Sequence, residues 1–200
     1  MADGAHPQGS LTPAPELAGR ARRLFFNPAI GWLRDILFAI VLALIIIAFV
    51  YQPVKVEGTS MAPYLSDQER IFINKFTYQF GPIQRGDVVV FRYPLDPKKS
   101  FIKRVVGLPG ETVEIRRGLM YVNGNPLREN YLPADEFDRE SYSAVTLPVD
   151  HFFVLGDRRR SSNDSRAWGP VHRSFIYGKA VFAYWPLERF GPIETVNGDD

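Results

Sequence analysis

The chain has 200 residues and a mass of 22.7 kDa, which allows one domain of ordinary size with a small appendage. Its 46% hydrophobic and 23% charged residues exclude a chain that is disordered throughout. The absence of cysteine excludes disulfides, thiolate zinc sites and cysteine nucleophiles, and a net charge of +2 gives no general case for binding nucleic acid.

Residues 1–31 are expected to form a disordered cytoplasmic tail with a basic flank. Residues 1–19 hold few bulky side chains, so they have too little apolar surface to offset the entropy cost of ordering. Arg20, Arg22 and Arg23 supply the basic flank.

Residues 32–51 are expected to form a transmembrane anchor. The run from 36 to 51 reads ILFAIVLALIIIAFVY without a charge, and with residues 32–35 it reaches about the length that spans a hydrocarbon core. A buried core helix and a cleaved secretory signal are the alternatives, although the run exceeds the usual signal core of about 7–15 residues. More arginine precedes the run than follows it, which favours a cytoplasmic N-terminus and an extracytoplasmic domain over residues 52–200.

The fold class expected is mostly β, with a single N-terminal transmembrane helix followed by an antiparallel β-sheet catalytic domain. Gly and Pro, 16 of each, oppose long helices and favour short strands joined by turns. Alternating or short apolar runs predict strands at 54–56, 70–75, 87–91, 101–106, 112–117, 119–122, 152–155 and 175–185. Asn123-Gly124 is typical of a hairpin turn, and an irregular excursion is expected near 112–150, centred on the polar, Tyr-rich stretch 128–145.

Histidine chemistry and metal binding are not favoured. His6 lies in the tail, and His151 directly precedes an apolar strand, where it is expected to cap or pack. With His172 they are the only histidines, and three scattered histidines without cysteine show no metal-ligand spacing. No metal and no cofactor are therefore expected.

A serine and a lysine are more informative. Gly58 permits a backbone conformation that can hold Ser60 exposed, with nearby N–H groups free to bind an oxyanion, although most Gly-x-Ser strings are ordinary turns. Alternation places Lys103 on one face with Phe101 and Val105, and desolvation by such neighbours lowers a lysine pKa toward that of a general base. The alternative is an edge lysine whose amine reaches water.

Four motifs occur in a specific order: VEGTSMAP at 56–63, RGDVV at 85–89, KRVVGLPGE at 103–111, and GD at 156–157 continuing to SNDSR at 162–166. Over residues 35–186 this order closely resembles type I signal peptidase, the bacterial membrane-anchored leader peptidase. The resemblance implies that Ser60 is the nucleophile and Lys103 the general base of a serine–lysine endopeptidase.

The resemblance also implies that Ser162 helps to orient the lysine amine and that Asp164 pairs with Arg166 behind it. The small-residue substrate pockets of the family fall at Met61, Leu65, Phe101 and Ile102. Family enzymes cut after Ala-x-Ala-like sequences, so the implied partners are signal-peptide-bearing precursors and membrane lipid, without nucleic acid. The implied location is the inner membrane, crossed once.

Two departures from the family pattern stand out. Gly58 occupies a position where some members have a hydroxyl residue, so the oxyanion hole is expected to rely on backbone N–H groups, including that of Ser60. Arg158 stands where the family usually has Asn after Gly156-Asp157, and it begins an arginine run, 158–160. A solvated turn is the preferred interpretation of this run, and a basic surface near lipid headgroups is the alternative.

Two rival functions remain at this stage. A self-cleaving repressor-like protease shares a serine–lysine pair, but it is soluble and carries a DNA-binding module that this sequence lacks. A catalytically inactive membrane-anchored β-domain that binds lipid or protein is the other. Because Ser60 follows the anchor so closely, Met61, Leu65 and Phe80 are expected to form an exposed patch that touches lipid.

Overall fold

The computed structural model describes residues 28–133, 135–136 and 138–195. Most of the tail expected over residues 1–31 therefore lies outside the described residues. The chain divides into two compact units, Met1–Ile47 and Ala48–Asp200.

The N-terminal apolar segment is a helix, α2, over Pro28–Val50. Proline suits the first helical turn, where its missing N–H costs no hydrogen bond. The stretch Gly31–Val50 has a mean hydropathy of 2.7, and none of it is buried. Exposure along the whole stretch is unlike a buried core helix, and its length and composition suffice to cross a membrane.

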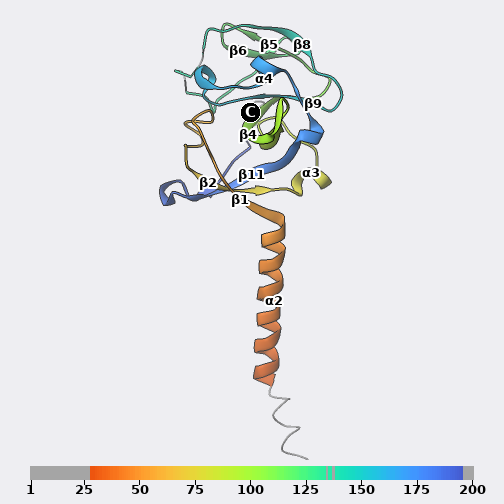
Figure 1. Ribbon diagram of the computed structural model, residues 1–200, viewed down its shortest axis with the longest axis vertical. Coiled ribbons are helices and arrows are strands. Elements are labelled where there is room, and N and C mark those ends of the chain that lie inside the picture. The colour runs from red at the N-terminus through yellow and green to blue at the C-terminus, as the bar shows by residue number, and fades with distance from the viewer. Residues whose placement is uncertain (1–27, 134, 137, 196–200) are drawn as a thin grey trace, which may run out of the picture. The chain divides into compact units, whose positions relative to one another are not determined.

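The main sheet of the second unit has eight strands, in the order β1-β2-β11-β3-β4-β9-β10, with β12 added on β11 (Figure 1). Every pairing in it is antiparallel, which confirms the expected fold class. Its strands are β1 Tyr51–Lys55, β2 Arg70–Asn74, β3 Val88–Tyr93, β4 Asp96–Gly107, β9 His151–Leu155, β10 Val171–His172, β11 Ile176–Trp185 and β12 Gly191–Pro192.

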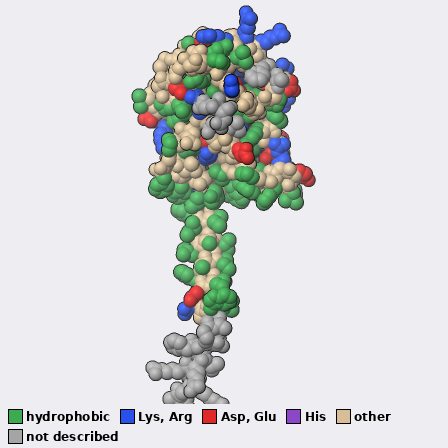
Figure 2. Space-filling model, turned by 180° about the vertical axis from the view of Figure 1, so that it is seen from behind, with side chains coloured by type: hydrophobic (Ala, Val, Ile, Leu, Met, Phe, Trp, Pro, Cys, Tyr) green, Lys and Arg blue, Asp and Glu red, His purple; other side chains and the backbone are tan. Residues whose placement is uncertain are grey.

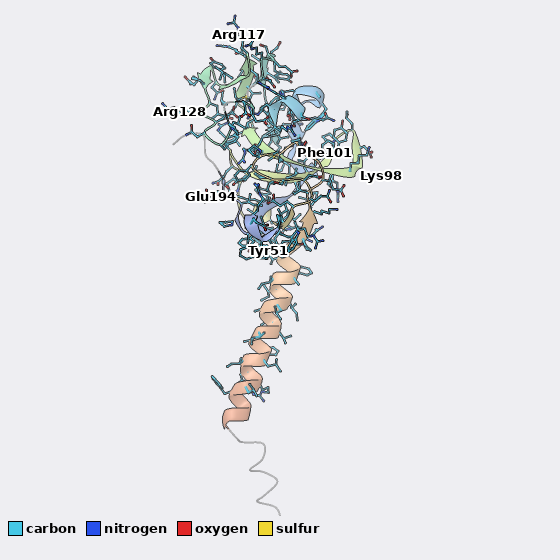
Figure 3. All side chains as sticks on the ribbon, turned by 90° about the vertical axis from the view of Figure 1, so that its left-hand side faces the viewer. Tyr51, Lys98, Phe101, Arg117, Arg128 and Glu194 are labelled. Atoms are coloured by element: carbon cyan, nitrogen blue, oxygen red, sulfur yellow. The ribbon has the colours of Figure 1, made fainter. Side chains whose placement is uncertain are left out.

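A second antiparallel sheet has the order β7-β6-β5-β8. Its strands are β5 Thr112–Arg116, β6 Leu119–Val122, β7 Asn125–Pro126 and β8 Tyr142–Thr146. Asn123 and Gly124 both have positive φ and form the expected tight turn between β6 and β7. Arg117, at the tip of the β5–β6 hairpin, and Tyr51, at the start of β1, lie at opposite ends of the domain (Figure 3).

Within the range near 112–150 where an irregular excursion is expected, β5 and β6 form the predicted hairpin, and the described residues between 127 and 141 contain no strand. Strands β7 and β8 lie on either side of that stretch and were not predicted. Strand β8 was missed because it is an edge strand that pairs only with β5 and is largely exposed. Such a strand has little of the apolar alternation by which a strand is recognised in a sequence.

Helices are short in the rest of the described chain, as the glycine and proline content predicts. The longest after α2 are the four-residue helices α3 Thr77–Phe80 and α4 Ser165–Trp168. Three 3-10 turns complete the set: η1 Arg159–Ser161, η2 Arg173–Phe175 and η3 Leu187–Arg189.

Three apolar cores hold the domain together, and a strand that lies between two cores contributes side chains to both. On β3, Val88 and Val90 enter one core, while Val89 and Phe91 enter a second on the other face. Strand β9 divides the second core from a third core beneath the small sheet in the same way. Alternate side chains of a strand point to opposite faces, so a strand with a core on each side reads as a continuous apolar run.

Candidate active site

Ser60 lies in the loop that joins β1 to β2. Two hydrogen bonds close the base of this loop: Val56 N donates to Glu69 O at 2.8 Å, and Gln68 N donates to Val56 O at 2.9 Å. Gly58 has φ +90, a conformation that side chains strongly disfavour, and its N–H donates to Asp67 Oδ1 at 2.8 Å. The Gly58 N–H is therefore engaged in shaping the loop.

The structure contradicts the placement of Met61 and Leu65 in the substrate pockets and in a lipid-facing patch. Leu65 N donates to Met61 O at 2.8 Å, so the chain after Ser60 makes a tight turn. Both side chains are 1% exposed and lie in the first core. Phe80, the third residue expected in the patch, is 87% exposed.

Lys103 lies on β4 and faces the loop that carries Ser60. Strand β4 pairs with β3 through Lys103 and Val89, and with β9 through the next residue, Arg104. Lys103 is thus on an interior strand and is only 4% exposed, which rules out an edge lysine that reaches water. Its Nζ donates a hydrogen bond of 2.6 Å to Ser60 Oγ, and lies 5.6 Å from the ring centre of Phe101.

Burial lowers the pKa of Lys103 to about 8, because a desolvated ammonium is costly. The carboxylates of Asp164 and Asp157 act in the opposite direction and keep the pKa from falling further. An amine with a pKa near 8 is substantially neutral at slightly alkaline pH. It can then accept the proton of the hydroxyl with which it is already hydrogen-bonded.

Arg104 points away from Lys103 into a buried ion pair that sequence reasoning did not assign. Its Nε and Nη2 bind Asp157 Oδ1 and Oδ2 at 2.9 and 2.7 Å. The side chains of both residues are at most 1% exposed, and the guanidinium lies between the rings of Tyr64 and Tyr131. The sequence feature that could have pointed to this buried position is strand alternation, which places Arg104 on the face opposite Lys103.

Asp164 and Arg166 form the pair that the family resemblance implies. Arg166 Nε donates to Asp164 Oδ1 at 2.9 Å, and Nη2 donates to Oδ2 at 3.0 Å. Asp164 Oδ2 also accepts a hydrogen bond of 3.1 Å from Gly156 N. As the N-cap of α4, Asp164 additionally accepts from Arg166 N at 3.2 Å. One carboxylate thus joins the start of the 156–166 loop to its end.

The 156–166 loop rests directly on Ser60. Arg158 N donates to Ser60 O at 3.0 Å. Gly156 is so close that a Cβ there would lie 2.5 Å from Ser60 O and 2.2 Å from Ser162 Oγ, so only glycine fits. Ser162 Oγ is buried without a hydrogen-bond partner among the described residues, so its expected contact with the Lys103 amine stays a prediction.

The arginine run 158–160 is not simply a solvated turn, because Arg159 is only 4% exposed. Its guanidinium binds the carboxylate of Glu129, which is 6% exposed. The sequence shows three like charges in a row and cannot show that a carboxylate thirty residues earlier neutralises the middle one.

A cleft of about 310 Å³ opens beside the two side chains. Its lining comprises Val54, Lys55, Val56, Glu57, Ser60, Val90, Ser100, Phe101, Ile102, Lys103, Asn163 and Tyr177. Phe101 and Ile102 both line this cleft, with Phe101 further along β4 than Lys98 (Figure 3), and their role as substrate pocket stays a prediction. Sequence reasoning missed the walls from β1, β3 and β11, including Tyr177, whose hydroxyl donates to Ser100 Oγ at 3.0 Å. Among the described residues, no three His, Asp or Glu side chains converge as metal ligands.

The chain is similar to known proteins over most of its length. The sequence pattern of the family described as "Signal peptidase, peptidase S26" matches residues 29–185. A signal peptidase I of Leptolyngbya laminosa is 40% identical over 177 residues, covering 84% of this chain and 85% of the relative. Signal peptidase I P of Bacillus subtilis subsp. natto is 35% identical over 169 residues, covering 80% of this chain and 91% of the relative.

A crystal structure of a signal peptidase I from Enterococcus faecalis aligns with a TM-score of 0.44 at 33% identity, covering 50% of this chain and 97% of that chain. The family match and the two alignments each extend over most of this chain. The residues matched by the family include Ser60 and Lys103. On that evidence the chain belongs to the signal peptidase family, peptidase S26, and is a serine endopeptidase of the signal peptidase I type.

Proposed function

We propose that this enzyme removes N-terminal signal peptides from exported precursors by acyl transfer, with Ser60 as nucleophile and Lys103 as general base. The observation that carries the proposal is the 2.6 Å hydrogen bond from Lys103 Nζ to Ser60 Oγ at the wall of the cleft. The depressed pKa of the lysine suits a base that works near neutral pH. Among the described residues, Lys103 is the only lysine that is buried.

The reaction begins when neutral Lys103 accepts the Ser60 hydroxyl proton while Oγ bonds to the scissile carbonyl carbon. The backbone N–H of Ser60 donates to the resulting oxyanion. As the C–N bond breaks, the lysine ammonium returns the proton to the leaving amine, which is the new N-terminus of the mature protein. Lys103 then takes a proton from water, the hydroxide attacks the ester, and the proton returns to Ser60 Oγ as the signal peptide leaves as an acid.

The cleft supports a preference for small side chains beside the scissile bond. Ile102, Val56 and Val90 wall it with branched side chains, and its volume of about 310 Å³ is at the lower end for ligand sites. Small side chains of an extended signal peptide fit such a cleft, while larger ones would need the walls to move. This is the size restriction that an Ala-x-Ala-like cleavage sequence satisfies.

We further propose that α2, which ends at Val50, one residue before the end of the expected anchor of residues 32–51, anchors the enzyme in the inner membrane. Its N-terminus would then be cytoplasmic and the catalytic domain, expected over residues 52–200 and beginning in the structure with β1, would lie outside the cytoplasm. Strand β1 follows α2 without an intervening loop, so the start of β1 is held at the membrane surface. Hydrophobic side chains gather along the lower edge of the domain (Figure 2).

The exposed apolar residues that support lipid contact differ from those expected. Besides Phe80, the residues Trp185, Leu187 and Phe190 are exposed, at 52%, 68% and 62%. The last three lie at the end of β11 and in or beside η3. Exposed aromatic and apolar side chains of this size are a liability in water, and a membrane interface accommodates them.

The decisive experiment is cleavage of a signal-peptide-bearing precursor by the purified full chain. We expect release of the mature protein by the wild type, and none by Ser60→Ala or Lys103→Arg, because guanidinium cannot deprotonate. Ser161→Ala, an exposed serine of η1, is the matched control and should cleave normally. A wild type that binds vesicles but leaves the precursor intact would favour the inactive anchored domain instead.

A further inference from the structure

Three ion pairs hold the 156–166 loop that rests on Ser60: Arg104–Asp157, Arg166–Asp164 and Arg159–Glu129. The third pair has not yet been given a role. Arg159 Nη1 donates to Glu129 Oε2 at 2.8 Å, and Nη2 binds Oε1 of the same carboxylate. The remaining donor, Arg159 Nε, binds Gly156 O at 3.1 Å. The guanidinium therefore uses its fork on the carboxylate and its third donor on the backbone of the catalytic loop.

The segment held in this way binds Ser60 directly and reaches Lys103 only through the neighbouring residue on β4. Through Arg158 N it donates to the carbonyl of Ser60 at 3.0 Å. Through Asp157 it binds Arg104, the residue that follows Lys103 on β4. A shift of this segment would move the nucleophile relative to the base.

Glu129 and Tyr131 lie in one short segment, 129–131, that contacts both Arg159 and Arg104. Glu129 Oε1 accepts a hydrogen bond of 2.6 Å from the hydroxyl of Tyr131. The ring of Tyr131 in turn lies 4.3 Å from the guanidinium carbon of Arg104. Segment 129–131 therefore connects Arg104, which follows Lys103 on β4, with Arg159, which supports the loop on Ser60.

We propose that Glu129 and Arg159 are a positioning pair that sets Ser60 Oγ against Lys103 Nζ, an inference that rests on the proposed function. A buried ion pair can often be replaced by apolar side chains of similar size without loss of stability, so stability alone does not require it. An apolar pair cannot supply the directional bond to Gly156 O. The pair makes hydrogen bonds to Gly156 O and the Tyr131 hydroxyl and none to a residue that lines the cleft, so we expect its loss to change kcat more than KM.

The test is the double variant Glu129→Leu/Arg159→Met in the full chain, which removes both charges together. We expect kcat for precursor cleavage to fall about 10- to 100-fold, since small misplacements of reacting groups have effects of this size. KM should stay within about twofold, and the melting temperature within a few degrees of the wild type.

The matched control is Glu111→Leu/Arg85→Met, which removes a half-buried ion pair that braces the end of β4 away from Ser60. It should leave kcat unchanged even if the melting temperature falls. A double variant at 129 and 159 that folds and keeps its kcat overturns the proposal, and so does a rise in KM that accounts for the whole loss. If this variant fails to fold, Arg159→Lys retains the charge without the fork, and a normal kcat in it overturns the proposal equally.

Wild-type cleavage in the same assay tests the proposed function separately. If the wild type and the double variant at 129 and 159 cleave equally fast, only the proposed role of the pair is contradicted. A wild type that does not cleave contradicts the peptidase assignment itself.

Discussion

Replacing Lys103 with methionine should abolish cleavage and at the same time stabilise the folded enzyme. Methionine is close to lysine in length, so it can fill the same space on β4 without a charge. The expectation follows from the burial of Lys103, which is 4% exposed and has its pKa lowered to about 8 from an ordinary value of 10.5.

The size of the gain follows from that pKa. A change in proton affinity from 10.5 to about 8 means that burying the ammonium costs on the order of 3 kcal/mol. At pH 7 the lysine is protonated in both the folded and the unfolded chain, so the full cost is present. Losing the hydrogen bond to Ser60 Oγ offsets about 1 kcal/mol of the gain. The net stabilisation is about 2 kcal/mol, or a rise of about 4–8 °C in melting temperature for a domain of this size.

The pH dependence gives the sharper test. Between pH 8 and 10.5 the unfolded chain holds more protons on this lysine than the folded chain, so the wild type gains stability as the pH rises. By pH 10 most of the cost has gone, and Lys103→Met should melt at nearly the wild-type temperature. Thermal unfolding of the detergent-solubilised full chain at pH 7 and pH 10 measures the difference in melting temperature between wild type and variant at each pH. Lys98→Met, at an exposed lysine, is the control. A variant that melts at or below the wild-type temperature at pH 7 refutes the reasoning.

Other consequences of the site are equally direct. The rate of precursor cleavage at low substrate should rise about tenfold per pH unit below pH 8 and level off above it, and a midpoint near 10.5 would contradict a desolvated Lys103. Ile102→Ala should widen the cleft and raise cleavage after leucine about tenfold relative to alanine, as measured with paired precursors; an unchanged ratio would remove Ile102 from the specificity wall. Phe80→Asp with Phe190→Asp should slow cleavage of a vesicle-embedded precursor severalfold but not of a detergent-solubilised peptide, and equal rates on both would exclude lipid contact.

Much of the framework could be predicted because its signals are local. Alternation along β2, β4 and β11 and the continuous apolar run of β3 mark the strands, and the uncharged run before Tyr51 marks the helix. The motifs around Ser60 and Lys103 predicted that these two residues act together, and in the structure their side chains are hydrogen-bonded. Periodicity also placed Lys103 and Arg104 on opposite faces of β4, as the structure shows.

Errors arose where a side chain's environment depends on a distant segment. Met61 and Leu65 were expected to be exposed beside the nucleophile, but the turn after Ser60 directs both into the first core. The burial of Arg159 depends on Glu129, and the sequence offers no periodicity that joins them. Strand β8 has little apolar character because β5 is its only partner.

What the sequence by itself determined is which residues alternate, which are charged and which motifs occur in order. Only the tertiary structure decided that β4 is an interior strand between β3 and β9, which leaves the Lys103 amine desolvated and not exposed at a sheet edge. The same strand order brings β1, β3, β4 and β11 together around one cleft. The physical reason is that a backbone pattern specifies the face to which a side chain points, while desolvation and hydrogen bonding depend on what another part of the chain places opposite that face.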